Sequence, residues 1–429
     1  MKTIVDTTNI YVEGKKVYPD VPLIDLQDVG YVVPVLNKQE QAAKIIKDYI
    51  NANHVMNVLA QLQANGLTEN DLVACPVIDL VNVPIRETHM ASWFIFGGNK
   101  QMIEFPNIYP LREYNQQTPT YNGFNECNNL EGTITCEYQI GTAYDSQHYD
   151  MMLGGFFGAC RKLEHVVNFD VSQLPKNANL NDDKTYVYTN VRLVNPCSMF
   201  DGCYKIKTID IKFPNFYYRY DQAFNNCYEL TNQEDITIDM TNIPSWVNED
   251  NDDLVDRENK KCNLENVFNE NHKATKFPTI TGQSNIMKFI CGFNNYGTES
   301  GVIAQEDFHL SYAEGANIHR VFDNCYILKD LYIDTTNEPD ANDDGAWCFI
   351  PFNDIGCSQI GTDNDSNPIY GWDGWNADWD QNAKNKATWL NLLKVHFQSQ
   401  ELKEKFLAKF ETDTTSAKYG ALDKMFVVD

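Results

Sequence analysis

The sequence predicts an α+β repeat fold, a solenoid in which each repeat contributes a helical turn and a short strand. Two observations predict it. The pattern Phe-x-x-Cys-x-x-Leu recurs through the middle of the 429-residue chain, and a short alternating apolar run follows its Leu. Self-similarity of this kind is typical of stacked repeats, which bury their apolar side chains only against neighbouring repeats.

Four copies of the pattern are complete, and a fifth carries Ile in place of Leu. They are Phe124-Cys127-Leu130, Phe157-Cys160-Leu163, Phe200-Cys203-Ile206, Phe224-Cys227-Leu230 and Phe322-Cys325-Leu328. Three worn copies start at Phe96, Phe268 and Phe293, with Asn99, Asn271 and Tyr296 at the Cys position. Phe and Cys three residues apart share one face of a helical or 3₁₀ turn, and Cys acts as a small buried hydrophobe.

Each alternating run after the pattern predicts a strand, because β-branched and aromatic residues with period two favour extended structure. The runs are 133–135, 166–169, 209–211, 236–238 and 331–333. Two long polar insertions separate the units, at 176–190 and 248–261, and the second of these is acidic. Such insertions either form a binding face or are solvated loops, and the residues alone leave both open.

The pattern resembles the BspA-type leucine-rich repeat, in which Phe-x-x-Cys-x-x-Leu precedes a short strand. The resemblance covers about residues 93–336 and implies a leucine-rich-repeat-like solenoid, without implying a function. The chain is also similar in style to structural proteins of crAss-like Bacteroides phages, being acidic and rich in Asn and Tyr. That second resemblance implies a virion protein and carries no site residues.

Three regions follow from this pattern. Residues 1–90 are a cap or docking region, 91–336 the repeat solenoid, and 337–429 a Trp-rich segment with capping helices. The first contains extended segments over residues 1–36 and an amphipathic helix that starts at a capping box, Asn37 with Glu40, and ends near Gly66. A solenoid cap and a docking domain for a larger assembly both fit it.

Candidate ligand contacts lie in the Trp-rich segment. Trp372, Trp375 and Trp379 share helical spacing, which fits packing against the last repeat or, less simply, a platform for a sugar. Residues 363–367 resemble the opening of a calcium loop, but Pro368 replaces the required Gly and the closing Glu is missing, so an EF-hand is rejected.

Two amphipathic helices are predicted to close the chain and to cap the solenoid. The first carries Trp389, Leu390, Leu393 and Phe397. The second starts at Ser399 and carries Leu402, Phe406 and Phe410.

Composition excludes several classes of function. The net charge is −26, from 60 acidic and 34 basic residues, which argues against binding to nucleic acid and to anionic membranes. We see no signal peptide and no long apolar run, and therefore expect a chain made in the host cytoplasm without membrane insertion. The twelve Cys are best explained as reduced core residues, and without a Cys-x-x-Cys pair they predict no zinc.

No catalytic motif is found, so we predict no enzyme, no catalytic residues, no metal and no cofactor. The leading hypothesis is a structural component of a phage virion, in the tail or another attachment assembly. Its expected partners are other virion proteins, further copies of the chain and a host glycan or surface protein. The alternatives are a bacterial cell-surface adhesin and a cytoplasmic recognition module; the 47 Asn fit an AT-rich genome as well as a phage.

Overall fold

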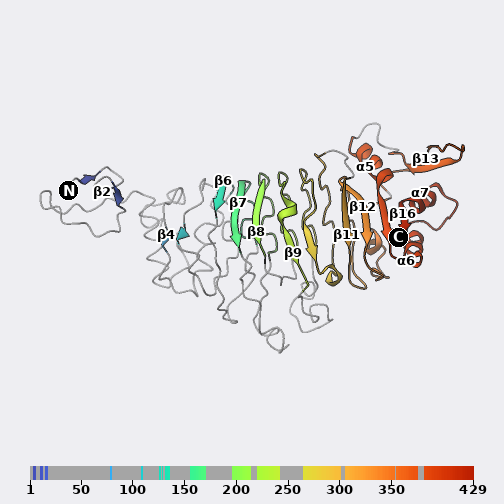
Figure 1. Cartoon of the computed structure of the whole chain (residues 1–429), viewed down its shortest axis with the longest axis horizontal. Coiled ribbons are helices and arrows are strands. Elements are labelled where there is room, and N and C mark those ends of the chain that lie inside the picture. Colours follow the sequence, from blue (N-terminus) through green and yellow to red (C-terminus); the bar gives the residue numbers. More distant parts are fainter. Residues whose placement is uncertain are drawn as a thin grey trace, which may run out of the picture.

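The structure is a computed structural model of the chain. It describes residues 155–170, 196–213, 220–241, 264–300, 305–352, 354–374 and 381–429, with short strands within residues 3–109 and parts of 125–135. In Figure 1 the labelled strands from β6 to β12 stand side by side along the long axis, in the order of the sequence. The expected helix from Asn37 and both long insertions lie outside the described residues.

Three short strands within residues 3–17 agree with the extended segments predicted for residues 1–36, and residues 18–36 lie outside the described residues. β1 (Thr3–Val5), β2 (Ile10–Val12) and β3 (Lys15–Val17) form an antiparallel three-stranded sheet. β4 (Ile78–Asp79) and β5 (Ile108–Tyr109) form a short parallel pair.

Parallel pairing joins the strands of successive repeats. β6 (Glu131–Thr135), β7 (Lys162–Asp170) and β8 (Thr208–Lys212) form one sheet, and β9 (Thr237–Asp239) pairs with β10 (Thr279–Thr281). A third sheet has the order β11 (Glu306–Leu310), β12 (Leu328–Ile333), β15 (Lys394–Phe397), β16 (Phe426–Val428). All five predicted runs coincide with strands, apart from Ile236, which directly precedes β9. β10 and β11 were not predicted.

The backbone of the Phe-x-x-Cys segment differs from the predicted helical turn. It is a run of turns in which the residues two before and two after each Phe have positive φ, as at Gln222 (56°) and Asn226 (57°) around Phe224. Left-handed residues break a helix because they reverse the local direction of the peptide groups. In a helix these backbone amides would donate to carbonyls of the same segment, whereas here they donate to carbonyls of the next repeat.

Three backbone hydrogen bonds per unit connect neighbouring turns. In the unit at Phe200 they run from Ser198 N to Asp221 O (3.0 Å), Phe200 N to Ala223 O (2.8 Å) and Gly202 N to Asn225 O (3.0 Å). The same donors recur in the unit at Phe224, where Gln222, Phe224 and Asn226 donate to Glu265, Val267 and Asn269. The turns thus form a hydrogen-bonded ladder of their own beside the strand ladder, which satisfies these backbone amides and carbonyls.

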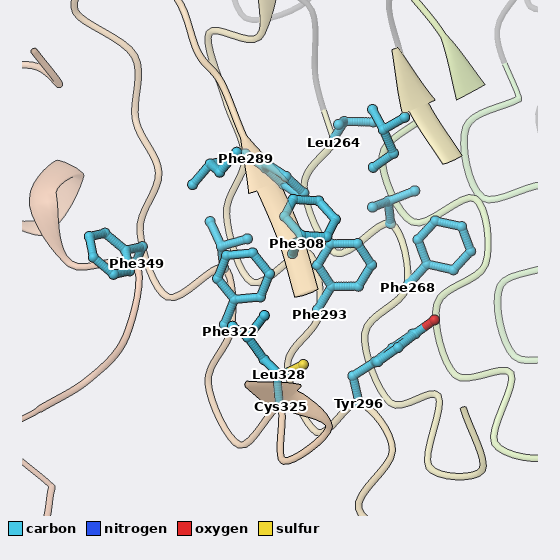
Figure 2. Close-up of a cluster of buried hydrophobic side chains, with 14 of the residues drawn as sticks. Leu264, Phe268, Phe289, Phe293, Tyr296, Phe308, Phe322, Cys325, Leu328 and Phe349 are labelled. Atoms are coloured by element: carbon cyan, nitrogen blue, oxygen red, sulfur yellow. The ribbon is translucent and has the colours of Figure 1, made fainter. Parts of the chain in front are cut away.

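A continuous stack of phenylalanine rings fills the core. The ring centroids of consecutive repeats lie 5.4, 5.7, 4.8, 5.7 and 5.6 Å apart through Phe157, Phe200, Phe224, Phe268, Phe293 and Phe322, with interplanar angles of 18° or less. All six rings are fully buried. Figure 2 shows the last three, with Phe308 beside them and Phe349 beyond Phe322. Burying such rings against each other contributes most of the stability of a repeat stack.

The Cys position has a second role besides filling volume. The thiols of Cys203 and Cys227 donate to the carbonyl oxygens of Phe157 (3.0 Å) and Phe200 (3.3 Å) in the preceding repeats. In the worn copy, the amide of Asn271 donates to Phe224 O at 2.8 Å in the same way. Asn therefore replaces Cys here because both present a donor to the same carbonyl.

The C-terminal region closes the stack with helices and a hairpin. It comprises β13 (Cys357–Thr362), β14 (Pro368–Trp372), α5 (Gln381–Leu392), α6 (Gln400–Phe410) and α7 (Ala417–Met425). A short 3₁₀ turn, η9 (Asp344–Trp347), precedes these elements, and two others, η5 (Gln233–Asp235) and η8 (Gln283–Asn285), lie among the repeats. Ser399 caps α6 by accepting from Leu402 N, which confirms the predicted start of that helix.

The first predicted closing helix is partly wrong. α5 contains Trp389 and Leu390, but it ends at Leu392, and Phe397 lies on β15. Apolar spacing alone fits a helix through this stretch. Pairing with β12 decides the matter, because Leu331 and Ile333 lie in register with Val395 and Phe397 and extend the parallel sheet.

Candidate binding surfaces

The predicted ladder residues lie in the core and not at a surface. Of the five Phe-Cys-Leu copies, the four from Phe157 onward are fully buried at all three positions. Phe124, Cys127 and Leu130 lie outside the residues whose side chains the structure describes. Within the described range every Cys is a free thiol, and burial raises the pKa of Cys203, Cys227 and Cys325. Such buried, protonated thiols are unsuited to nucleophilic chemistry at neutral pH.

Of the candidate ligand-binding tryptophans, Trp372 is only 2% exposed. Its ring stacks on Phe352 at 5.8 Å, and its backbone amide donates to Asn391 Oδ1 at 3.0 Å. The structure thus places Trp372 in the core of the C-terminal region, where its ring offers no free face to a sugar. Trp375 and Trp379 lie outside the described residues.

A row of stacked side chains lies at the surface where each turn leads into its strand. We call Arg161, Tyr204, Tyr228 and His272 the aromatic stripe. Tyr204 stacks on Tyr228 with centroids 4.9 Å apart, and Tyr228 stacks on His272 at 4.8 Å. The Arg161 guanidinium lies over the Tyr204 ring at 5.5 Å, a cation–π contact. The three rings are half-buried, so their edges face solvent.

Charged residues follow the stripe at the next position of each repeat. Lys205 and Lys273 both pair with Glu229, at 3.4 and 2.6 Å. Lys162 is exposed and, like Arg161, forms no ion pair with any residue that the structure describes. At the stripe position and the one after it, the charged side chains of these repeats are thus the four cations Arg161, Lys162, Lys205 and Lys273, the carboxylate of Glu229 and the imidazole of His272, in a chain whose net charge is −26.

The stripe ends at His272. Its Nε2 lies 2.7 Å from Glu270 Oε2, and this hydrogen bond raises the pKa of the imidazole. The next repeat has Gly297 at the corresponding position, where a Cβ would lie 2.7 Å from Ile327 Cγ2. No ring fits there, so the aromatic stack is interrupted.

One repeat later the same edge is covered by the chain itself. Tyr326 occupies the stripe position, is fully buried, and contacts Trp389 of α5 edge-to-face at 5.9 Å. Its hydroxyl donates to Asn382 Oδ1 at 2.8 Å. At Tyr326, therefore, a helix covers this edge.

Sequence reasoning missed the stripe, although its signal is simple. Each member directly follows the Cys position of a repeat, so the residues share a place and not a type. Phe, Cys and Leu define the repeat pattern, and these positions lie in the core. The positions between them mark the surface.

A second ladder lies on the strands of the third sheet. His309, Tyr332 and His396 stack with centroids 4.6 and 4.3 Å apart. His396 is hydrogen-bonded on both sides, to Asp330 (2.9 Å) and to the carboxylate of Asp429 (2.8 Å). Because its rings and carboxylates satisfy each other, this ladder ties β12, β15 and the chain end together.

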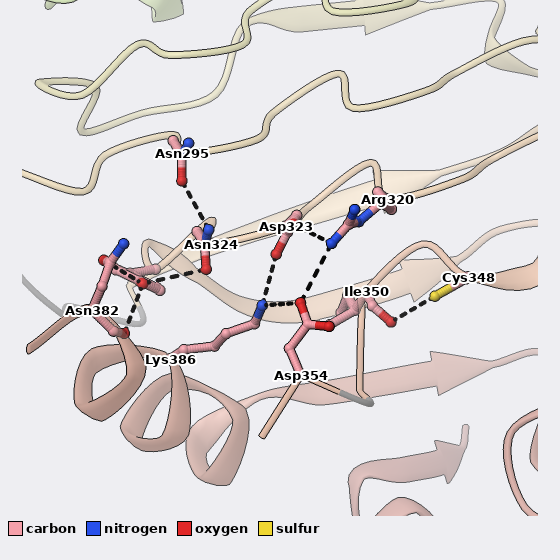
Figure 3. A network of polar contacts seen from close by, with 10 residues as sticks. Asn295, Arg320, Asp323, Asn324, Cys348, Ile350, Asp354, Asn382 and Lys386 are labelled. Carbon is pink, nitrogen blue, oxygen red and sulfur yellow. Dashed lines mark hydrogen bonds and ion pairs between the residues drawn. The ribbon is translucent and has the colours of Figure 1, made fainter. Parts of the chain in front are cut away.

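Figure 3 shows a polar cluster that joins α5 to the last repeat. The ammonium of Lys386, which is 5% exposed, lies 2.8 Å from Asp323 and 3.0 Å from Asp354. Arg320 also contacts both carboxylates, at 3.2 and 3.4 Å. Two cations face two carboxylates, so the cluster is balanced and acts as a junction.

The acidic loop at 363–367 is the tip of the β13–β14 hairpin. Asp363 accepts hydrogen bonds from the amides of Asp365 and Asn367 and from the Asn367 side chain. The Asp363 carboxylate is thus engaged by hydrogen bonds from within the loop. Among the described residues no group of three His, Cys, Asp or Glu side chains is placed to hold a metal, and no helix is long and apolar enough to span a membrane.

Comparison of the chain with family models, with curated proteins and with solved structures finds no match. The stacked core and its surfaces are therefore the basis for any statement on function.

Proposed function

We propose that this protein is a non-enzymatic structural and binding component built on a leucine-rich-repeat-like solenoid. The observation that carries the proposal is the continuous stack from Phe157 to Phe322, which presents a rigid row of side chains at the surface. Repeat stacks hold surface residues at a fixed spacing, which suits recognition of an extended partner. The proposed mechanism is docking, without a chemical step.

The particle we propose for it is a phage virion, with the chain in the tail or another attachment assembly. Support comes from the resemblance to BspA-type repeats and to structural proteins of crAss-like phages, and from the acidic composition. Its partners would be other virion proteins and copies of itself, with a host glycan or surface protein as a further contact. Nucleic acid is not among them, since the net charge of −26 repels phosphates.

The second candidate is a bacterial cell-surface adhesin. The Phe-x-x-Cys-x-x-Leu pattern favours it, because repeats of the type it resembles suggest adhesins in bacteria. The two candidates share the solenoid and differ in location, so location is the property to measure.

Quantitative mass spectrometry of density-purified virions, host envelope and cytosol tests the proposal. We expect the chain in virions at a fixed ratio to the major capsid protein, and that ratio reports the symmetry of its site. Enrichment in the host envelope instead would establish the adhesin, and recovery only from cytosol would exclude both.

A further inference from the structure

We propose that the aromatic stripe is a docking surface for an acidic α-helix of another protein. The inference rests on the proposed binding role but not on the phage setting. It names the place and the kind of partner: a helix lying along Arg161, Tyr204, Tyr228 and His272, with carboxylates on the side that faces them.

The spacing of the stripe fits a helix. Its rings repeat every 4.8–4.9 Å, and the guanidinium continues the row at 5.5 Å. The pitch of an α-helix is about 5.4 Å, so residues three and four apart lie nearly one per rung. Over these rungs the mismatch stays within about 2 Å, which side-chain rotamers absorb.

The charges of the stripe select an acidic partner. Arg161 and Lys162 are exposed cations with no carboxylate partner among the described residues, and Lys205 is paired only loosely with Glu229. Most acids near the stripe lie toward its Tyr228–His272 end: Glu229 pairs with Lys205 and Lys273, Asp201 and Glu270 act on Tyr228, and Glu270 and Glu299 lie beside His272. At the other end, the Cα of Glu131 is in register with that of Lys162. The partner's carboxylates would therefore concentrate over the Arg161 end of the stripe.

The tyrosines supply hydrogen bonds. Neither the Tyr204 nor the Tyr228 hydroxyl has a hydrogen-bond partner within the described residues. Burial raises the pKa of Tyr228, which keeps its hydroxyl a neutral donor. Rigid Tyr side chains beside Arg are typical of residues that carry most of the energy of protein interfaces, because little rotamer freedom remains to be lost.

The chain itself shows how a helix occupies this edge. At Tyr326, α5 provides Trp389 to the ring and the Asn382 amide oxygen to the hydroxyl. The positions at Tyr204 and Tyr228 present the same ring and hydroxyl, and no helix of the described residues is seen to contact them. A second helix from outside would continue this arrangement toward the N-terminal repeats.

The test uses the full-length chain and two synthetic helical peptides of about 20 residues, with the helix content of both checked by circular dichroism. One carries Glu alternately three and four residues apart along one face. The other has the same composition in scrambled order. We expect the ordered peptide to bind at least about fivefold more tightly by fluorescence anisotropy, with binding that weakens as salt increases.

Matched charge reversals locate the contact. Lys162→Glu should weaken binding of the ordered peptide about tenfold, while Lys384→Glu, at an exposed position of α5, should change it less than about twofold. Tyr228→Phe, which removes only the hydroxyl, should weaken it about threefold. Both lysines are exposed, so folding is not at issue.

Three results would overturn the proposal. Equal affinity for the two peptides would show that spacing plays no part. Tighter binding of polyphosphate, with the same sensitivity to Lys162→Glu, would make the stripe an anion site. Self-association of the chain that Lys162→Glu abolishes, without peptide binding, would assign the stripe to a second copy. None of these bears on whether the chain is found in virions.

Discussion

At the scale of the residue, the repeat depends on donors as much as on apolar volume. Cys203, Cys227 and Asn271 each donate to the Phe carbonyl of the preceding repeat. The prediction from sequence that Cys acts as a small hydrophobe is confirmed by its burial, but it explains only half of the position. The donor role accounts for the Asn in the copy at Phe268, which apolar matching alone marks as worn.

Asn271 therefore gives a prediction. Asn271→Ala removes the donor to Phe224 O in a fully buried site and should cost about 1–3 kcal/mol. Asn271→Cys keeps a donor and should stay within about 1 kcal/mol of the native chain, since Gln233 retains its bond to Leu230 O. Differential scanning fluorimetry should show a lower melting midpoint for the Ala variant only. Equal midpoints for both variants would disprove the donor role.

At the scale of the element, the left-handed turn residues set the direction of the hydrogen bonds between repeats. The sequence contains a trace of them: the residue two after Phe is Gly202, Asn226, Asn295 or Asn324 in four of the repeats. Gly and Asn are the residues that adopt positive φ most readily. Because Phe and Cys three apart fit both a helix and this turn, the core pattern alone predicted the wrong backbone but the right buried face.

Ala substitutions at two glycines should distinguish the cost of positive φ from the cost of a steric clash with a neighbouring backbone. Gly282 and Gly315 both have positive φ, 69° and 71°. A Cβ on Gly282 would lie 2.4 Å from the backbone of Met240 in the neighbouring repeat, whereas a Cβ on Gly315 meets nothing within 4 Å. Gly315→Ala should thus cost about 1 kcal/mol from φ alone.

Gly282→Ala should destabilise the fold by well over the amount expected for Gly315→Ala. Met240 N donates to Thr281 O (3.0 Å), and the two backbones cannot separate to admit a Cβ without losing this hydrogen bond. Thermal melts of the two variants, recorded side by side, give the comparison. If both lose the same amount, the spacing between β9 and β10 is softer than the structure indicates.

At the scale of the whole molecule, the order of the core was readable from the sequence, and its C-terminal end was readable only in part. Leu393 to Phe397 continues the apolar spacing of α5, yet β15 forms because β12 is there to pair with it. β16 then pairs with β15, and Asp429 returns to His396. Contacts between segments distant in sequence fix this end, and a local pattern contains no information on them. The aromatic stripe was missed for a related reason, since only stacking brings its members together.

The closure at the chain end should depend on pH. Burial lowers the pKa of His396, but hydrogen bonds to Asp330 and Asp429 outweigh it, so the folded pKa is raised. A raised pKa stabilises the fold below the unfolded value of about 6.5, and this stability is lost as pH rises through the folded value. Burial raises the pKa of Asp330, but hydrogen bonds from Lys329 and His396 outweigh it and leave the pKa lowered, so the contribution of Asp330 to stability is lost as pH falls below about 4.

The contact is therefore strongest near pH 5 to 6, roughly between those two limits. Hydrogen exchange of β16, corrected for intrinsic rates, should show higher protection at about pH 5.5 than at about pH 8. His396→Gln should abolish the difference. His272→Gln removes the other imidazole whose pKa is raised among the described residues, but His272 lies far along the stack and the substitution should leave β16 unchanged. β16 pairs with β15 on one side, and Asp429 follows it directly. Equal protection at both pH values would contradict the prediction. It would mean that strand pairing and the packing of Phe426 hold the chain end without the His396 ion pairs.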